Sequence, residues 1–273
     1  MRIPHPSSEW HVDEPSLSAA APGPLFISLS PKRVLKALLT VIFVLSALSF
    51  VGQLLQHFAG NFTGRDFYIN ITNVDREQTV PTLFSTVQIA ASAGIVALIA
   101  WSERRSASAT WKKWVALSVV MVYLTGDESL SLHERLNDPF RDALDATGSL
   151  YYAWVIPGAV AAVVVASYFL PFVLSLPSKV RSLMLLSGAM YVAGAIGFEL
   201  LGTAVRVNAA GFPFDNSTIN PPFAYVPLAA AEEGLEMTAI AVFIFACLLY
   251  LRSTGREIFL QPEPPESPDL KLV

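Results

Sequence analysis

The sequence predicts an all-α fold, a polytopic membrane bundle of six transmembrane helices with both termini in the cytoplasm. Three observations support it: 53% of the 273 residues are hydrophobic, only 15% are charged, and the mean hydropathy is +0.50. Soluble domains carry roughly one quarter charged residues. The formal net charge of -4 argues against a nucleic-acid partner, and the single cysteine excludes an intrachain disulfide.

Six apolar segments approach the ~20 residues that a spanning helix needs. They are expected at about 34–58, 82–102, 113–136, 150–175, 181–206 and 225–251. The third reaches full length only if the stretch GDESLSLHERL continues its helix. Together they define a transmembrane domain over 32–252. The flanking segments 1–31 and 253–273 are rich in proline and polar residues, which predicts disordered cytoplasmic tails.

Lysine and arginine set the expected orientation, because they favour the cytoplasmic side of a membrane. They cluster before the first helix, between the second and third, between the fourth and fifth, and after the sixth. The opposite loops, 59–81 and 207–224, are polar and rich in turn residues, and we expect them to cap the outer ends of the helices.

Acidic side chains gather toward the outer ends of three predicted helices. The third helix and its end supply Asp127, Glu128, His133 and Glu134, the fifth supplies Glu199, and the sixth supplies Glu232, Glu233 and Glu236. Charged residues at bilayer depth are costly and usually functional. Candidate accessory residues are His57, Arg206, Asp75 and Glu77. In the fifth helix, Ala189, Ala193 and Gly197 form a ridge of small residues, which predicts a closely packed neighbour.

Carboxylates this close need compensation by protonation, by salt bridges or by bound cations. Carboxylate and imidazole ligands suit a divalent metal, and the pattern does not distinguish Fe, Mn, Zn, Mg or Ca. The Glu-x-x-His pair of di-metal helix bundles does not occur in this sequence. The alternative interpretations are a solvated helix end for Glu134, a structural role for His133, and ordinary loop charges for Asp75 and Glu77.

The blocks VDREQTVPTLFS, DESLSLHERL, GFELLG and EEGLEM resemble a group of uncharacterised multi-pass bacterial membrane proteins that carry DExxxxHE, GxE and EExxEM patterns. The resemblance covers about residues 60–250. It implies a bacterial inner membrane and a similar helix count, and it implies no activity.

Three functions fit these observations. The first is a metal-dependent membrane enzyme that acts on a lipid or another amphipathic substrate from the periplasmic or exterior side. The second is a proton- or cation-coupled transporter. The third is a binding protein with a structural cation.

Because the inner halves of the six predicted helices contain no acid or histidine, the pattern favours a one-sided site. Membrane lipids are the expected partners, and the pattern specifies neither substrate nor oligomeric state. No GxSxG, Walker or GxGxxG motif is present.

Overall fold

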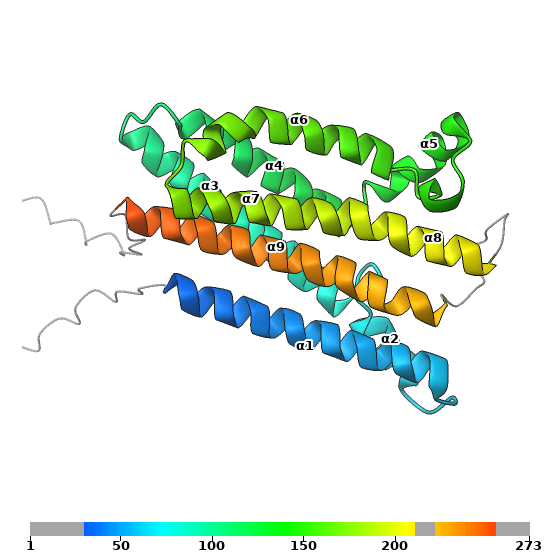
Figure 1. Ribbon diagram of the computed structural model, residues 1–273. Coiled ribbons are helices and arrows are strands. Elements are labelled where there is room, and N and C mark those ends of the chain that lie inside the picture. The colour runs from blue at the N-terminus through cyan, green and yellow to red at the C-terminus, as the bar shows by residue number, and fades with distance from the viewer. Residues whose placement is uncertain (1–29, 211–221, 255–273) are drawn as a thin grey trace, which may run out of the picture. The chain divides into compact units, whose positions relative to one another are not determined.

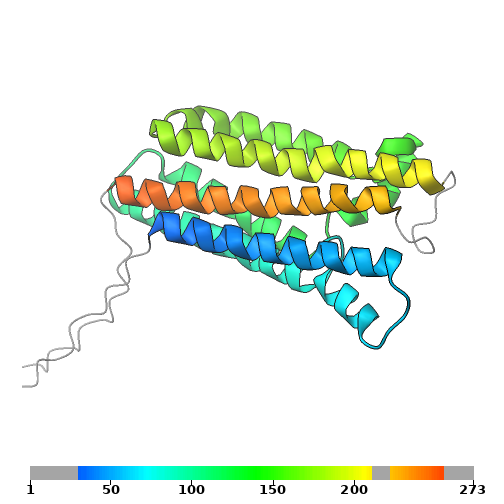
Figure 2. The ribbon, with the colours of Figure 1, turned by 60° about the horizontal axis from the view of Figure 1, so that its bottom comes forward.

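The computed structural model describes residues 30–210 and 222–254, and these form a bundle of long helices lying side by side (Figures 1 and 2). The helices are α1 Pro31–Phe58, α2 Arg65–Thr72, α3 Val80–Arg105, α4 Trp111–Leu130, α5 Asn137–Leu144, α6 Val155–Leu174, α7 Ser178–Val192, α8 Glu199–Ala210 and α9 Val226–Ser253. Short helical turns are η1 Glu134–Leu136, η2 Gly148–Leu150, η3 Ala193–Phe198 and η4 Phe223–Tyr225. No strand occurs within the described ranges, so the predicted all-α class is confirmed.

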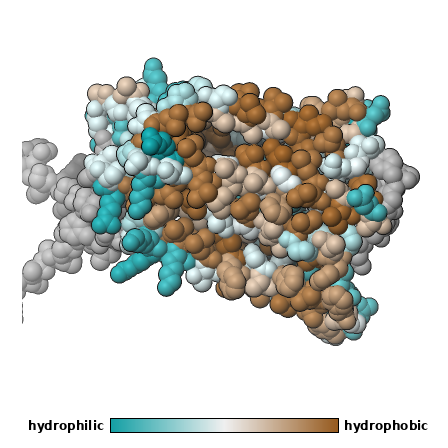
Figure 3. Space-filling model, viewed as in Figure 1, coloured by the Kyte–Doolittle hydropathy of each residue, from teal (hydrophilic) through white to brown (hydrophobic). Residues whose placement is uncertain are grey.

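Five described helices are long and apolar enough to cross a membrane, and the bent pair of α4 with Glu134–Leu144 would make a sixth. One of the five is continuous through α7, η3 and α8, over Ser178–Ala209. Large apolar side chains face outward, including Phe43 at 74% and Val163 at 65% exposure. Figure 3 shows apolar side chains over the middle of one face and polar ones toward its ends. This surface is suited to lipid. The tails predicted to be disordered lie largely outside the described residues.

Helix α9 is the central helix of the bundle. It contacts α1, α3 and α7, and it lies between α1 and α7 in Figure 1. Ala239, Ala241, Ala246 and Cys247 have no exposed surface. Small side chains let helix backbones approach closely, which gives dispersion contacts that replace the missing hydrophobic drive between helices in lipid.

Polar side chains of neighbouring helices donate hydrogen bonds to backbone carbonyls. Gln88 Nε2 in α3 donates to Met237 O over 3.1 Å, and Ser187 Oγ in α7 donates to Ala239 O over 2.8 Å. These bonds give buried donors a partner where water is absent, so they hold α3 and α7 against α9 at a defined depth.

The prediction that Ala189, Ala193 and Gly197 pack against a neighbouring helix is wrong. The small residue that allows close packing on α9 is Gly194. Ala189 and Ala193 are exposed, and no atom lies within 4 Å of a Cβ built on Gly197. A Cβ on Gly194 would lie 2.8 Å from Glu236 Cγ and 3.1 Å from Glu232 O. Gly194 lies in η3, a π-helical turn, which changes the face that the helix presents to its neighbour.

The third predicted helix, 113–136, ends at Leu130 in the structure. Ser131 adopts a left-handed conformation with φ 47°, and the chain then bends by 75° into Glu134–Leu144. The Asp127 carboxylate accepts a hydrogen bond from the backbone N–H of His133 over 2.9 Å. This bond satisfies a donor beyond the helix end, so the acidic stretch forms a helix terminus and a turn. The fourth predicted helix starts later than expected, at Val155 and not at 150.

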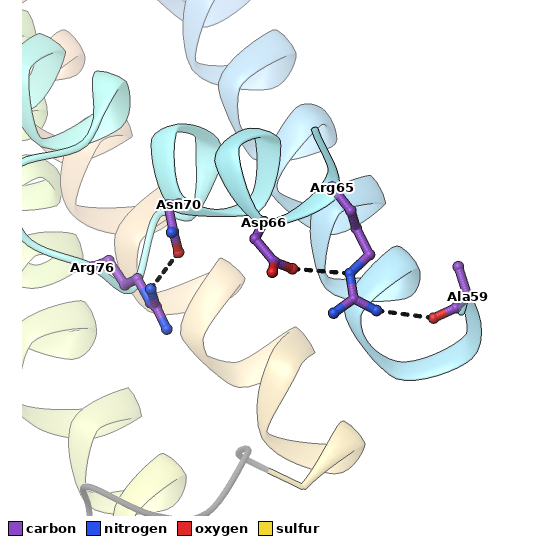
Figure 4. Close-up of polar contacts among 5 residues, drawn as sticks. All are labelled: Ala59, Arg65, Asp66, Asn70 and Arg76. Carbon is purple, nitrogen blue, oxygen red and sulfur yellow. Dashed lines mark hydrogen bonds and ion pairs between the residues drawn. The ribbon is translucent and has the colours of Figure 1, made fainter. Parts of the chain in front are cut away.

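The predicted cap over 59–81 contains α2, which is joined to the end of α1 by side-chain contacts (Figure 4). Arg65 Nη1 donates to Ala59 O over 3.1 Å, and Arg65 Nε lies 3.0 Å from Asp66 Oδ1. Arg76 donates to Asn70 Oδ1 on the far side of α2. The cap is therefore a short ordered helix. Most of the second predicted cap, residues 211–221, lies outside the described ranges.

The start of α1 and the end of α9 lie at one end of the bundle, together with the α3–α4 and α6–α7 connections (Figure 1). Helices α2 and α5 lie toward the other end. Cationic side chains at the first end stack on aromatic rings: Arg105 lies 4.0 Å from the Trp101 ring, and Lys113 Nζ lies 3.4 Å from the Tyr168 ring. Aromatic and basic side chains of this kind are common at membrane interfaces.

Candidate functional site

Helix α9 carries three acids into the bundle interior. Glu232 is 9% exposed, and Glu233 and Glu236 are half-buried. Glu199 begins α8 directly after the π-helical turn, where its side chain lies near that of Glu232. Thr203 Oγ1, one turn further along α8, donates to Glu199 Oε1 over 3.1 Å. The close approach at Gly194 thus brings the acids of α8 and α9 together.

Helix α4 adds Glu128 to the same region. Its carboxyl group lies beside the Ser85 hydroxyl of α3 and close enough to Glu236 to interact electrostatically. The Tyr191 side chain in α7 lies near both Glu128 and Glu236. We call Glu128, Glu199, Glu232, Glu233 and Glu236 the interior acid cluster.

A second group of side chains surrounds the turn after α4. Asp127 Oδ2 lies 3.0 Å from Nδ1 of His133, whose ring centroid is 4.6 Å from that of Trp154. Glu77, in the loop before α3, lies beside the Ser131 hydroxyl and interacts electrostatically with Glu134, which is exposed. These residues form the outer rim of the site, and Asp127 also interacts electrostatically with Glu236.

Asp75 connects the cap to the start of α9. The Tyr225 hydroxyl donates a short hydrogen bond to Asp75 Oδ1. The Arg206 guanidinium lies 4.7 Å from the Tyr225 ring centroid and 5.9 Å from that of Tyr152. Asp75 interacts electrostatically with Arg206 and with Glu199. Arg206 is therefore a cation on this side of the site, and Arg76 also interacts with Asp75.

The two acids of the α2–α3 loop have perturbed acidities. Burial raises the pKa of Asp75 from 3.8 to about 6, although the Tyr225 hydrogen bond and Arg206 both lower it. Burial also raises the pKa of Glu77. The neighbouring Ser131 hydroxyl lowers this pKa in part, and the charge of Glu134 raises it further. Loss of hydration of the charged form therefore outweighs the favourable contacts of both groups.

The structure brings acids of α4, α8 and α9 close to one another. Glu134 is exposed, whereas His57 lies in the last turn of α1. Its Nδ1 is 2.9 Å from Gln53 O, and its ring centroid is 5.4 Å from that of Phe223. In the described part of the chain, no three His, Cys, Asp or Glu side chains are arranged to hold a metal ion. The metal role of the predicted residues therefore stays a prediction.

Sequence reasoning missed one buried acid at the opposite end of the bundle. Glu103, 4% exposed, accepts hydrogen bonds from Tyr250 Oη over 3.0 Å and from Thr110 Oγ1 over 3.3 Å. The expectation that the inner halves of the helices lack acids is therefore wrong. It failed because the predicted second helix stopped at 102, whereas α3 continues to Arg105. Ser85, Tyr191 and Tyr225, whose side chains lie near these acids, also gave no signal in the sequence.

The fold and the site define a class of protein: a bundle of long apolar helices, suited to a membrane, with carboxylates in its interior. Residues 34–251 match the family described as Domain of unknown function (DUF8692), and the chain belongs to that family. The predicted resemblance to a family without an assigned activity is thereby confirmed. No curated protein and no solved structure matches the chain.

The raised pKa of Asp75 predicts a pH-dependent effect of Asp75→Asn. Because the folded state binds this proton more tightly than the unfolded state, the wild type loses stability as pH rises through the interval from 3.8 to about 6. The variant lacks this loss. Its melting temperature relative to wild type should therefore increase between about pH 4 and about pH 7. Thermal melts of both proteins in the same detergent measure the difference.

Asp66→Asn is the matched control, because the Asp66 side chain is 78% exposed. It controls for the loss of one carboxyl group in the same part of the chain, so the pH dependence of Asp75→Asn is read relative to it. If Asp75→Asn shows no increase relative to this control, the assignment of Asp75 as a buried acid with a raised pKa is contradicted.

Proposed function

We propose that the chain is a six-span protein of the bacterial inner membrane, with cytoplasmic termini and with the interior acid cluster in the outer leaflet. The six-span count takes α4 and the bent segment after it as one interrupted span. The orientation is supported by Arg104, Arg105, Lys112 and Lys113, which lie around the α3–α4 connection at the same end as the start of α1. The bacterial setting rests on the sequence resemblance.

Single-cysteine labelling tests this orientation. Cys247 has no exposed surface, so a membrane-impermeant thiol reagent should not label the wild type. In right-side-out vesicles, Thr63→Cys should be labelled from outside, and Ala109→Cys only after the membrane is made permeable. The reverse pattern would place the acid cluster in the cytoplasmic leaflet.

The function that we propose for the interior acid cluster is reversible proton binding. The observation that carries this proposal is an imbalance of charge. Five carboxyl groups from α4, α8 and α9 lie within one another's fields, whereas the nearby cationic candidates are Arg206 and His133. Burial and like charges both favour the neutral acid. The proximity of Glu199 and Glu232 fits a pair of carboxyl groups that shares a proton.

Proton exchange would take place with the outer side of the membrane. Asp75, Glu77 and the outer rim link the interior acids to the capped end of the bundle. Toward the cytoplasm, the next acid is Glu103, which bonds Tyr250. Tyr250 lies fourteen residues beyond Glu236, about 21 Å along α9, and no acid or histidine of α9 lies between them. This gap supports a one-sided site over a relay across the membrane.

Infrared spectroscopy of the full-length protein in lipid tests the proposal. Protonated carboxyl groups have a carbonyl band that carboxylates lack, and we expect this band at neutral pH. Glu236→Gln and Glu232→Gln should each remove about one carboxyl group's share of it. Asp66→Asn, which changes an exposed acid, should leave the band unchanged.

Two results would overturn the proposal. One is a spectrum of the folded wild type at neutral pH without a protonated-carboxyl band. The other is a band that survives both glutamate substitutions at full intensity.

A divalent metal site is the second candidate, favoured by the types of ligand that meet here. Glu199, Glu232 and Glu236 approach from two helices, and the Asp127–His133 pair lies at the rim. Side-chain rotation would be needed to direct three of these groups at one ion, since no such set is preformed among the described residues. The hypothesis of a metal-dependent enzyme that acts on a lipid depends on this rearrangement.

Metal analysis distinguishes the second candidate from the first. A metal site predicts stoichiometric metal in the purified wild type and at least a tenfold weaker affinity in Glu199→Gln and Glu236→Gln. Substoichiometric metal after incubation with Fe, Mn, Zn, Mg or Ca salts, in a protein that shows the infrared band, would rule out the metal site.

A further inference from the structure

A small polar cavity lies between the outer end of α1, the α2–α3 loop and the start of α9. Its polar lining consists of Ser49, Gln53, Asn73, Asp75 and Tyr225, and apolar residues of α1 and α9 complete its walls. The space has room for about one guest the size of a water molecule. The cavity is separate from the interior acid cluster, since none of the five glutamates of that cluster lines it.

One buried acceptor in this cavity has no partner. Gln53 is 6% exposed, and its Oε1 atom is buried without a hydrogen bond. The neighbouring acceptors are in use: Ser49 Oγ accepts from Val74 N over 3.0 Å, and Asn73 Oδ1 accepts from Asp75 N over 3.0 Å. A buried carbonyl oxygen is normally paired, so the exception at Gln53 points to a guest in the cavity.

The chemistry of the lining selects the class of guest. Amide, hydroxyl and carboxylate oxygens surround the space, and the lining contains one acid and no basic side chain. Oxygen ligands of this kind suit hard cations. A single carboxylate and the size of one water molecule fit a monovalent ion better than Mg or Ca, which usually take several charged or water ligands.

The charges around Asp75 are consistent with this assignment. Tyr225 donates to its Oδ1, whereas Arg206, Arg76 and Glu199 interact with it electrostatically. None of Arg206, Arg76 and Glu199 lines the cavity. Because the pKa of Asp75 is about 6, its carboxylate is largely ionised at neutral pH and available to a cation.

We propose that this cavity binds one compact monovalent cation, an alkali-metal ion or ammonium, through Gln53 Oε1 and the Asp75 carboxylate. The site joins α1, the cap and α9, so an occupied site stabilises the contact between the cap and the bundle. The proposal does not depend on the protonation state of the interior acid cluster.

Thermal melts of the full-length protein test the site. They are run at constant chloride and ionic strength in sodium, potassium, ammonium or choline chloride, with a separate magnesium arm. We expect at least one compact cation to raise the melting temperature by about 3 °C over choline. Gln53→Met, which keeps the side-chain length and removes the oxygen, should abolish this increment, as should Asp75→Asn.

Two variants serve as matched controls. Gln88→Met removes another buried glutamine amide, and Glu77→Gln removes a nearby loop acid outside the cavity lining. Both should retain the cation-dependent increment. If Gln53→Met does not fold, calorimetric titration of the wild type and Asp75→Asn with the effective cation decides the same question.

The proposal fails if the melting temperature of the wild type is the same in all monovalent salts and choline. It also fails if the increment survives in both Gln53→Met and Asp75→Asn, or if only magnesium produces it. None of these outcomes alters the infrared band by which the interior acid cluster is tested, so the two proposals can fail separately.

Discussion

The contact between η3 and the acidic part of α9 is the constraint on which the other features of the site depend. Gly194 approaches the Glu232 carbonyl and the Glu236 side chain too closely for any larger residue to fit without a shift. The same α9 is the most buried of the candidate membrane spans. Carboxyl groups are thus placed where hydration is lost and where the neighbouring helix cannot move away. Their charge must be balanced by the groups around them.

The surrounding helices meet this requirement mainly with neutral donors. The hydroxyl groups of Thr203 and Tyr225 donate to Glu199 and Asp75, and that of Ser85 lies beside Glu128. A hydroxyl can donate to a carboxylate or accept from the neutral acid, although the Tyr225 bond favours the charged form of Asp75, whereas arginine has no acceptor and pairs only with a carboxylate. Arg206 is placed over the rings of Tyr225 and Tyr152, at the side of the site near Asp75. This set of neutral donors is one basis of our proposal that the interior acids bind protons reversibly.

The sequence was sufficient to predict the helical bundle, because long apolar segments have few alternatives in a membrane. It also placed the acids of three helices at a common depth, since helical rise converts residue number into position. It could not show that α4 stops at Leu130, because that end depends on a hydrogen bond from the backbone N–H of His133 to the Asp127 carboxylate. It likewise misplaced the small-residue contact, since the π-helical turn changes the helix face that a regular period implies. Tertiary partners such as Tyr191 and Ser85 have no local signature.

The π-helical turn also has a consequence for the history of the helix that contains it. A π turn is equivalent to one residue inserted into a regular α-helix. If Ala193–Phe198 kept its length but formed a regular α-helix, Glu199 would be rotated by about 100° around the axis, away from Glu232. Deletion of one residue that removes the π turn would instead leave Glu199 in register with the chain before it. A relative one residue shorter here would therefore keep the two acids together on a regular helix, whereas a relative of equal length without the π turn would separate them. Segment length and helix geometry must thus be read together to recognise chains with the paired carboxyl groups.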